Sequence, residues 1–253
     1  MDQRFEGKTV IVTGSSSGIG EAVARRFSKE GANVVLVSRT REKLDKVAAD
    51  LAAERTVVQV RDVSDEAQVQ AMVAAAVARF GGLDVLVSNA GTAVMKDFAD
   101  TTTEDWKTTL ATHLDAVFYG AKAALPHLIA SKGCIVHTAS VSGLGGDWGM
   151  SAYNVAKGGV VNFTRALALD LGKHGVRVNA VAPSFTATDL TADMLKDPET
   201  IEKFNARMPL GAPEHPDDIA GPVLFLACDD ARKITGVILP VDGGVMASNG
   251  QPA

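Results

Sequence analysis

Three side chains in the middle of the chain have the types and spacing needed for proton transfer. Tyr153 and Lys157 are four residues apart in an apolar stretch of helical period, so both lie on one helical face. Ser140 closes the preceding β-branched run, and ligands bind at the carboxyl ends of strands in parallel sheets. A nearby ammonium favours phenolate, so Lys157 should lower the pKa of Tyr153 from its ordinary value of about 10. Tyr153 could then exchange a proton with a carbonyl or alcohol oxygen that Ser140 also contacts.

A Tyr-x-x-x-Lys pair on a helix is more often structural, so its context decides the interpretation. A glycine-rich turn, TGSSSGIG at 13–20, follows the first β-branched run and opens the first helical stretch. Glycines let the backbone approach a pyrophosphate, and a helix N-terminus offers free N–H groups and partial positive charge. The alternative is a Gly/Ser turn without a ligand. The predicted contacts with the dinucleotide are Gly14, Ser16, Ser17, Gly18, Ile19 and Gly20.

The end of the second β-branched run indicates which dinucleotide is bound. NAD-binding proteins place an acid about 20 residues beyond the glycine-rich turn, where it holds the ribose 2′-hydroxyl. Here the run ends at Ser38 and Arg39, without an acid. A guanidinium suits a 2′-phosphate, so these residues predict NADP, with NADPH preferred over NADH. The alternative is that Arg39 is only a solvated loop charge.

The elements that must position these residues alternate along the whole chain. Apolar β-branched runs that predict strands lie at 9–13, 33–38, 56–60, 84–91, 134–140, 176–183 and 237–244. Helical stretches separate them, which predicts an α/β fold: a Rossmann-type, doubly wound sheet of seven parallel strands with helices on both faces. We expect one dinucleotide-binding catalytic domain over 1–253. The long irregular segment 184–216 is predicted to be a lid that covers the substrate.

Composition narrows the function classes. The 253 residues are 46% hydrophobic and 22% charged, which is a globular composition. A net charge of −5 without a block of like charge disfavours nucleic-acid and membrane partners. The start, MDQRFEGK, is not a signal peptide, so a cytoplasmic protein is expected. Cys134 and Cys228 are expected to be reduced core thiols, and no metal site is predicted.

The motifs together resemble the short-chain dehydrogenase/reductase family. The resemblance is carried by TGSSSGIG, the NAG at 89–91, Ser140, the YNVAK at 153–157 and the PSFTAT at 183–188, and it covers essentially the whole chain. It implies hydride transfer between a nicotinamide and a carbonyl or alcohol carbon, with Ser140, Tyr153 and Lys157 as catalytic residues. Lys157 would also hold the nicotinamide ribose. Members are often tetramers, and a homotetramer is expected here because the helical stretch 155–171 is apolar on nearly every side.

The same resemblance implies further contacts with the cofactor. Asp62 and the adjacent Val63 would meet the adenine, and Asn89, Ala90 and Gly91 would support the ribose and the central strand. Segment 183–188 would hold the carboxamide, with Pro183, Thr186 and Thr188 as its contacts.

The chain departs from the family pattern at two positions. Ser184 replaces the usual glycine after the sixth strand, and His113 replaces a fourth catalytic residue, an asparagine. His113 is either a tolerated helix residue or part of a modified proton relay that pH tunes. In the second case we expect a neutral imidazole, with activity falling as the pH drops through the ordinary histidine pKa of about 6.5.

The substrate is the least determined part of the site. Ser142, Trp148, Asn154 and Phe185 are candidate substrate contacts, which suggests a small, mostly apolar molecule, although Trp148 could pack only against protein. Stretches 132–149 and 240–252 resemble bacterial acetoin reductases, also called 2,3-butanediol dehydrogenases, which act on small diketones, hydroxyketones and vicinal diols.

The predicted function is therefore an NADPH-preferring oxidoreductase of short-chain type that acts on a small ketone or secondary alcohol. One alternative is a 3-oxoacyl-thioester reductase of fatty-acid type, which would need a basic surface for an acidic carrier protein. The other is a non-catalytic dinucleotide-binding sensor, which would predict loss of Tyr153 or Lys157.

Overall fold

One parallel sheet organises the computed structural model, which describes residues 3–92 and 95–249. Its strands lie in the order β3-β2-β1-β4-β5-β6-β7, so the direction of winding reverses between β1 and β4. The strands are β1 (Thr9–Thr13), β2 (Asn33–Ser38), β3 (Thr56–Val60), β4 (Val85–Ser88), β5 (Cys134–Thr138), β6 (Arg177–Pro183) and β7 (Ile238–Val241). The predicted seven-stranded Rossmann-type sheet is confirmed. Residues 250–252 of the stretch 240–252 lie outside the described residues.

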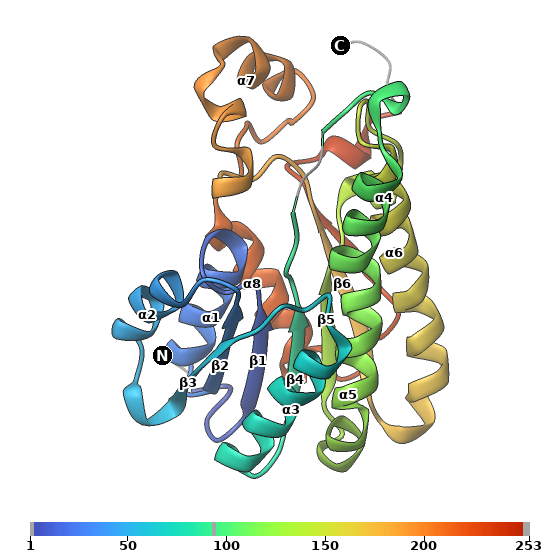
Figure 1. Ribbon diagram of the computed structural model, residues 1–253. Helices are drawn as coiled ribbons and strands as arrows, with labels where there is room; N and C mark the ends of the chain where they lie inside the picture. Colours follow the sequence, from blue (N-terminus) through green and yellow to red (C-terminus); the bar gives the residue numbers. More distant parts are fainter. Residues whose placement is uncertain (1–2, 93–94, 250–253) are drawn as a thin grey trace.

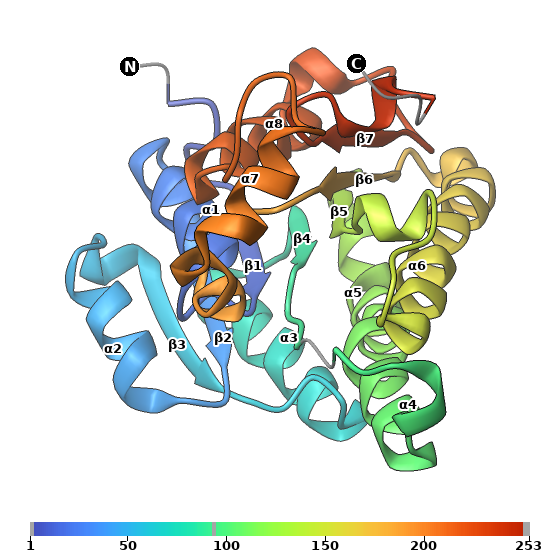
Figure 2. The same cartoon turned by 90° about the horizontal axis from the view of Figure 1, so that it is seen from above.

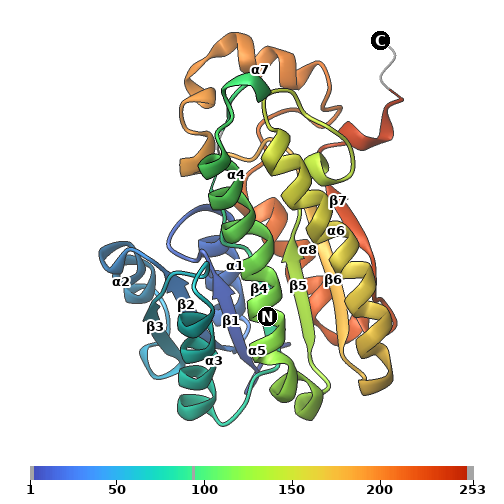
Figure 3. The same ribbon diagram turned by 45° about the vertical axis from the view of Figure 1, so that its right-hand side comes forward.

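Helices cover both faces of this sheet (Figures 1 and 3). One layer holds α1 (Gly18–Lys29), α2 (Arg41–Ala49) and α8 (Pro216–Ala227). The other holds α3 (Glu66–Phe80), α5 (Ala116–Ser131) and α6 (Ser151–Leu171). Two more helices, α4 (Thr103–Leu110) and α7 (Pro198–Asn205), lie beyond the carboxyl ends of the strands (Figures 1 and 2). In the described residues, no helix combines the length and apolar character needed to cross a bilayer.

Successive residues of each strand pack into different cores, because side chains alternate across a sheet. In β1, Val10 and Val12 join the cluster under α1 and α8, whereas Ile11 joins the cluster under α3 and α5. All three side chains are fully buried. Complete burial of such a side chain stabilises the fold by about 1.5–3 kcal/mol. Burial on both faces is why the runs of β1 and β4 are predominantly apolar.

Several predicted strands end earlier than their apolar runs. Pairing in β4, β5 and β7 stops at Ser88, Thr138 and Val241, respectively. The residues that follow leave the sheet at its carboxyl edge. This is the edge where the glycine-rich turn also lies, between β1 and α1. The elements of the predicted site therefore meet at the reversal of strand order, where open α/β sheets bind their ligands.

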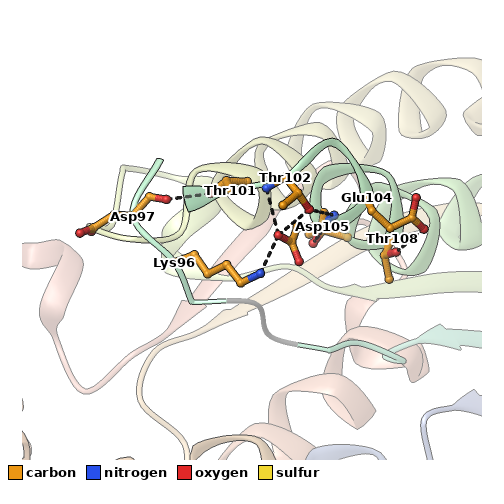
Figure 4. A network of polar contacts seen from close by, with 8 residues as sticks. Lys96, Asp97, Thr101, Thr102, Glu104, Asp105 and Thr108 are labelled. Carbon is orange, nitrogen blue, oxygen red and sulfur yellow. Dashed lines mark hydrogen bonds and ion pairs between the residues drawn. The ribbon is translucent and has the colours of Figure 1, made fainter. Parts of the chain in front are cut away.

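The helical segment from Thr103 to Ser131 consists of three elements. Helix α4 begins with a capping box: Asp105 N–H donates to Thr102 Oγ1 at 3.1 Å, and Thr102 N–H donates to Asp105 Oδ2 at 3.0 Å. Lys96 donates to the same carboxylate at 2.7 Å (Figure 4), and this bond, with those from Thr102, lowers the pKa of Asp105 to about 2. A π-helical turn, Ala111–Asp115, then separates α4 from α5.

A close backbone contact at the start of β5 gives a test of this fold. A Cβ on Gly133 would lie 2.1 Å from the carbonyl oxygen of Asp84, the residue that precedes β4. We expect Gly133→Ala to lower the free energy of unfolding by at least about 1–3 kcal/mol, because the backbone must shift. Gly82→Ala is the control, since its Cβ would meet nothing within 4 Å. Urea denaturation measures both, and equal stabilities would contradict the described packing of β4 and β5.

Candidate active site

A cleft of about 610 Å³ opens at the carboxyl edge of the sheet. It brings together residues that lie far apart in the sequence, and nearly all of the predicted site residues line it. They are Gly14, Ser16, Ser17, Gly18, Ile19, Ser38, Arg39, Asp62, Val63, Asn89, Ala90, Gly91, His113, Ser140, Ser142, Trp148, Tyr153, Lys157, Pro183, Phe185, Thr186 and Thr188.

Two predicted residues lie behind the wall of the cleft. A Cβ on Gly20 would be 2.2 Å from the carbonyl oxygen of Gly14, so this glycine permits close packing of the turn. Asn154 donates to the carbonyl oxygen of Asp147 at 2.9 Å and thereby holds the loop that precedes α6. Neither residue is placed to contact a ligand directly.

Lys157 is the central charged group of the site. Its side chain is 5% exposed, and its ammonium donates to the carbonyl oxygen of Thr138, at the end of β5, at 2.6 Å. The same nitrogen lies 5.6 Å from the centre of the Tyr153 ring. A Cβ on Gly143 would lie 2.6 Å from the Lys157 backbone, so the loop after Ser140 can approach α6 only with glycine there.

Ser140 begins a short hydrogen-bond chain along the cleft. Its hydroxyl donates to Ser142 Oγ at 3.1 Å, and Ser142 in turn donates to the carboxylate of Asp147. Asp147 lies between Ser140 and Tyr153 in the sequence, where candidate pocket residues are expected, and it lines the cleft. These two hydrogen bonds fix the direction of the Ser140 hydroxyl.

Burial governs the protonation of the Tyr–Lys pair. Loss of water raises the pKa of Tyr153, a hydrogen bond with Ser140 opposes this rise, and the charge of Asp147 adds to it. Burial also lowers the pKa of Lys157 to about 8. The predicted lowering of the Tyr153 pKa by Lys157 is therefore not found, because desolvation of the phenol outweighs other effects. Tyr153 therefore keeps its proton at neutral pH.

His113 lies in the π-helical turn and is 2% exposed. Its Nε2 donates to the carbonyl oxygen of Thr92 at 2.5 Å, and its ring packs edge to face on Tyr153, with centroids 5.1 Å apart. Nδ1 is buried and has no hydrogen-bond partner among the described residues. A Cβ on Gly91 would lie 2.6 Å from this imidazole, so glycine is needed beside it.

The imidazole of His113 is neutral at ordinary pH. Burial, with a smaller contribution from the Lys157 charge, lowers its pKa to about 3. The predicted neutral form agrees with this value, but the predicted titration near pH 6.5 does not. The structure therefore gives His113 a place in the packing of Tyr153, without a proton to exchange in the working pH range.

The far end of the cleft from Tyr153 is lined by two guanidinium groups. Arg39 follows β2, and Arg61 follows β3, the neighbouring strand; the N–H of Arg61 donates to the carbonyl oxygen of Ser38 at 3.0 Å. Arg61 Nε is buried and has no hydrogen-bond partner in the described chain. Sequence reasoning missed Arg61, because the pairing of β2 with β3 is what brings it beside Arg39. Asp62 accepts from Ser64, which is the main reason that its pKa is lowered.

Apolar side chains line the end of the cleft near Tyr153. Phe185 is buried and stacks on Phe204 of α7, with ring centroids 4.2 Å apart. Trp148 is 85% exposed, so the alternative that it only packs against protein is not supported. Phe204 was missed, as were Lys203 and Arg207 beside it, because the sequence predicts a covering segment at 184–216 without showing which of its side chains face the cleft.

The cleft fits an extended dinucleotide with phosphates. Gly14 has φ +67° and lies against the backbone of Ala90, where a side chain would collide. Ser17, the N-cap of α1, makes no side-chain cap, so the helix N-terminus at the cleft keeps N–H groups for a ligand. Arg39 and Arg61 line the same cleft and carry further N–H donors at its far end.

Known proteins resemble this chain over nearly its full length. The family profile described as "Enoyl-(Acyl carrier protein) reductase" matches residues 14–246. The meso-2,3-butanediol dehydrogenase of Serratia marcescens is 49% identical over 249 residues, covering 98% of each chain.

Solved structures agree with this result. A short-chain dehydrogenase/reductase from Brucella melitensis has a TM-score of 0.92 at 37% identity and covers 97% of this chain and 99% of its own. A gluconate 5-dehydrogenase from Burkholderia cenocepacia, solved with NADP and tartrate, has a TM-score of 0.92 at 30% identity, covering 97% and 98%. Similarity of this extent establishes that the chain belongs to the short-chain dehydrogenase/reductase family and is an NAD(P)-dependent alcohol dehydrogenase.

Proposed function

We propose that this dehydrogenase prefers NADPH and interconverts small ketones and secondary alcohols, with hydroxyketones and vicinal diols as the first substrates to test. The observation that carries the proposal is the convergence of Ser140, Tyr153 and Lys157 on one cleft, with apolar walls at that end. The bound nicotinamide would supply or accept the hydride. The relative of known activity that acts on 2,3-butanediol supports the choice of substrates.

In this mechanism the protein residues handle the proton. The Tyr153 phenol gives its proton to the carbonyl oxygen as the hydride reaches the carbon, and Ser140 turns from Ser142 to donate to the same oxygen. Lys157, with a pKa of about 8, is protonated at neutral pH and stabilises the phenolate that remains. Its bond to the Thr138 carbonyl fixes the ammonium close to both the ring and the cleft. The reverse reaction uses the same groups in the opposite order.

The preference for NADPH is argued from charge at the adenosine end. No carboxylate closes β2, and Arg39 and Arg61 lie side by side where a ribose 2′-phosphate would lie. A guanidinium can bind a phosphate with two parallel hydrogen bonds. Gly14 to Gly20 would hold the pyrophosphate, and 183–188 would hold the carboxamide.

The substrate would lie under a lid. We propose that 184–216 covers it, with Phe185 and Phe204 on one side and Trp148 on the other. A salt bridge of 2.8 Å between Lys43 of α2 and Asp189 ties this segment across the cleft.

A second candidate function is the reduction of an acyl thioester carried by an acidic protein. Lys203 and Arg207, which line the cleft, favour it because they could attract an acidic carrier. Membership of a dehydrogenase family, with Tyr153 and Lys157 retained, argues against a non-catalytic sensor.

We further propose a cytoplasmic homotetramer. Helix α6 packs one side on the sheet, while Val155 and Leu169 on its other side are exposed, as is Phe118 of α5. Apolar side chains gathered on two adjacent helices suit an interface with further copies of the chain.

The reaction and its acid can be tested together. The parent enzyme should reduce diacetyl and acetoin with NADPH faster than aryl ketones or 3-oxoacyl thioesters. Tyr153→Phe should lower kcat by at least about 10²–10⁴-fold, because it removes the acid oxygen, and should leave the Kd of NADPH nearly unchanged. Nicotinamide absorbance and fluorescence measure the two quantities. A variant that kept a tenth of the rate would remove Tyr153 from its role, and faster turnover of thioesters would favour the second candidate.

Cofactor preference is tested at the two arginines. We expect a 10- to 150-fold preference for NADPH, because a hydrogen bond to a charged group contributes about 1.5–3 kcal/mol. Arg39→Ala and Arg61→Ala should each weaken NADPH binding and leave NADH binding unchanged. The double variant Ser38→Asp/Arg39→Ala should reverse the preference. Isothermal titration of the parent enzyme with both cofactors is the decisive measurement, and equal affinities would refute the proposal.

His113→Asn tests the histidine. Since burial lowers the His113 pKa to about 3, the kcat/KM profiles of parent and variant should have the same shape between pH 5 and 9. The rate itself should change, because the ring packs against Tyr153. An acid limb near pH 6.5 that only the parent shows would mean that His113 takes part as a titrating group.

A further inference from the structure

Glu214 is a buried carboxylate that the mechanism above does not use. It lies between α7 and α8 and is 7% exposed. Its backbone pairs with the segment that follows β6: Glu214 N–H donates to Phe185 O at 2.9 Å, and Ala187 N–H donates to Glu214 O at 2.8 Å. These bonds make an isolated parallel bridge between Thr186 and Glu214. The residue is thus joined directly to the wall of the cleft.

The side chain of Glu214 returns to the same segment. Its Oε2 accepts from Ser184 N–H at 3.2 Å and from Thr186 Oγ1 at 2.9 Å. Ser184, Phe185 and Thr186 line the cleft, whereas Glu214 does not. One residue therefore holds three consecutive wall residues from behind, through both its backbone and its side chain.

This position is costly for a carboxylate. Oε1 is buried without a hydrogen-bond partner, and no Lys or Arg of the described chain forms an ion pair with Glu214. Burial raises its pKa to about 7, the two hydrogen bonds oppose this, and the charges of Asp242 and Asp218 add to it. Asp242 accepts from Gly244 N–H and Asp218 from His215 N–H, so both acids are engaged elsewhere. A glutamine could make the same two bonds with less cost, which argues that the charge has a use.

The use that fits this geometry concerns Thr186. Its hydroxyl has one proton and two acceptors within reach, and Glu214 Oε2 at 2.9 Å lies nearer than the carbonyl oxygen of Ser184 at 3.3 Å. The remaining lone pairs of the Thr186 oxygen can then accept from a donor in the cleft. We propose that Glu214 is a positioning residue for the nicotinamide end of the cofactor: its ionised carboxylate holds 184–186 in place and presents the Thr186 oxygen as an acceptor. This inference rests on the proposed assignment of 183–188 to the carboxamide.

The test is equilibrium binding of NADH, which needs no turnover and therefore stays decisive if every substrate fails. NADH lacks the 2′-phosphate, whose own titration would complicate a pH series. The variants are Glu214→Gln, which keeps the acceptor but not the charge, and Glu214→Ala. Glu202→Gln, at an exposed site on α7, is the matched control. Nicotinamide fluorescence between pH 6 and 8.5 gives the Kd, and thermal unfolding over the same range gives the stability.

The parent Kd should fall several-fold as the pH rises through about 7, because ionised Glu214 makes stronger bonds to the wall. Glu214→Gln should lose this pH dependence, and Glu214→Ala should bind NADH about tenfold more weakly at pH 8.5. The stability of the folded parent should fall as the pH rises, whereas its affinity for NADH should increase. The folded-state pKa is raised, so the stability associated with protonated Glu214 is lost as the pH rises, and Glu214→Gln should gain in Tm on the parent at pH 8.5.

If Glu214 had only a structural role, its substitution would change the Tm and leave the Kd of NADH unchanged. The proposal fails if both Glu214 variants bind NADH as the parent does while their Tm changes. It also fails if Glu214→Gln keeps the pH dependence of the parent Kd, or if Glu202→Gln loses it.

Discussion

The catalytic end of the site depends on the buried ammonium of Lys157. An ammonium out of water is costly unless its donors are used, and the carbonyl of Thr138 accepts one of them at 2.6 Å. That carbonyl is free because the ladder of β5 ends at this residue. The bond requires the N-terminal turns of α6 to lie against the end of β5, which in turn requires a glycine at position 143. The geometry of Tyr153, one helical turn earlier, follows from the same contact.

The sequence predicts the framework well because burial on both faces leaves a clear pattern. Seven apolar runs became the seven strands, although β4, β5 and β7 are shorter than their runs. An apolar run in the sequence does not show where strand pairing stops. Asn89 and Ser140 belong to such runs, yet β4 ends at Ser88 and β5 at Thr138. The Ser–Tyr–Lys group was found because all three members lie within eighteen residues and follow a strand.

The residues that were missed all depend on contacts between distant segments. Arg61 is beside Arg39 only because β3 pairs with β2, and Phe204 meets Phe185 only because α7 folds back over the strand ends. No local pattern marks Glu214, because its carboxylate accepts hydrogen bonds from Thr186 and Ser184, which lie 28 and 30 residues earlier in the chain. The pKa of Tyr153 was predicted in the wrong direction for a related reason, because the pairing with Lys157 is visible in the spacing and the desolvation is not.

The π-helical turn at Ala111–Asp115 has a geometric consequence for the two helices that it joins. An α-helix advances about 100° around its axis with each residue, so one residue accommodated in a wider turn rotates everything beyond it by about that angle. The apolar face of α5, with Ala121, Ala124 and Leu128 on the sheet, therefore need not continue along α4. Helix α4 can turn a polar, separately capped face to its surroundings while α5 keeps its register with β4. This rotation at the π-helical turn lets the sequence of α4 vary independently of the apolar residues by which α5 packs on the sheet.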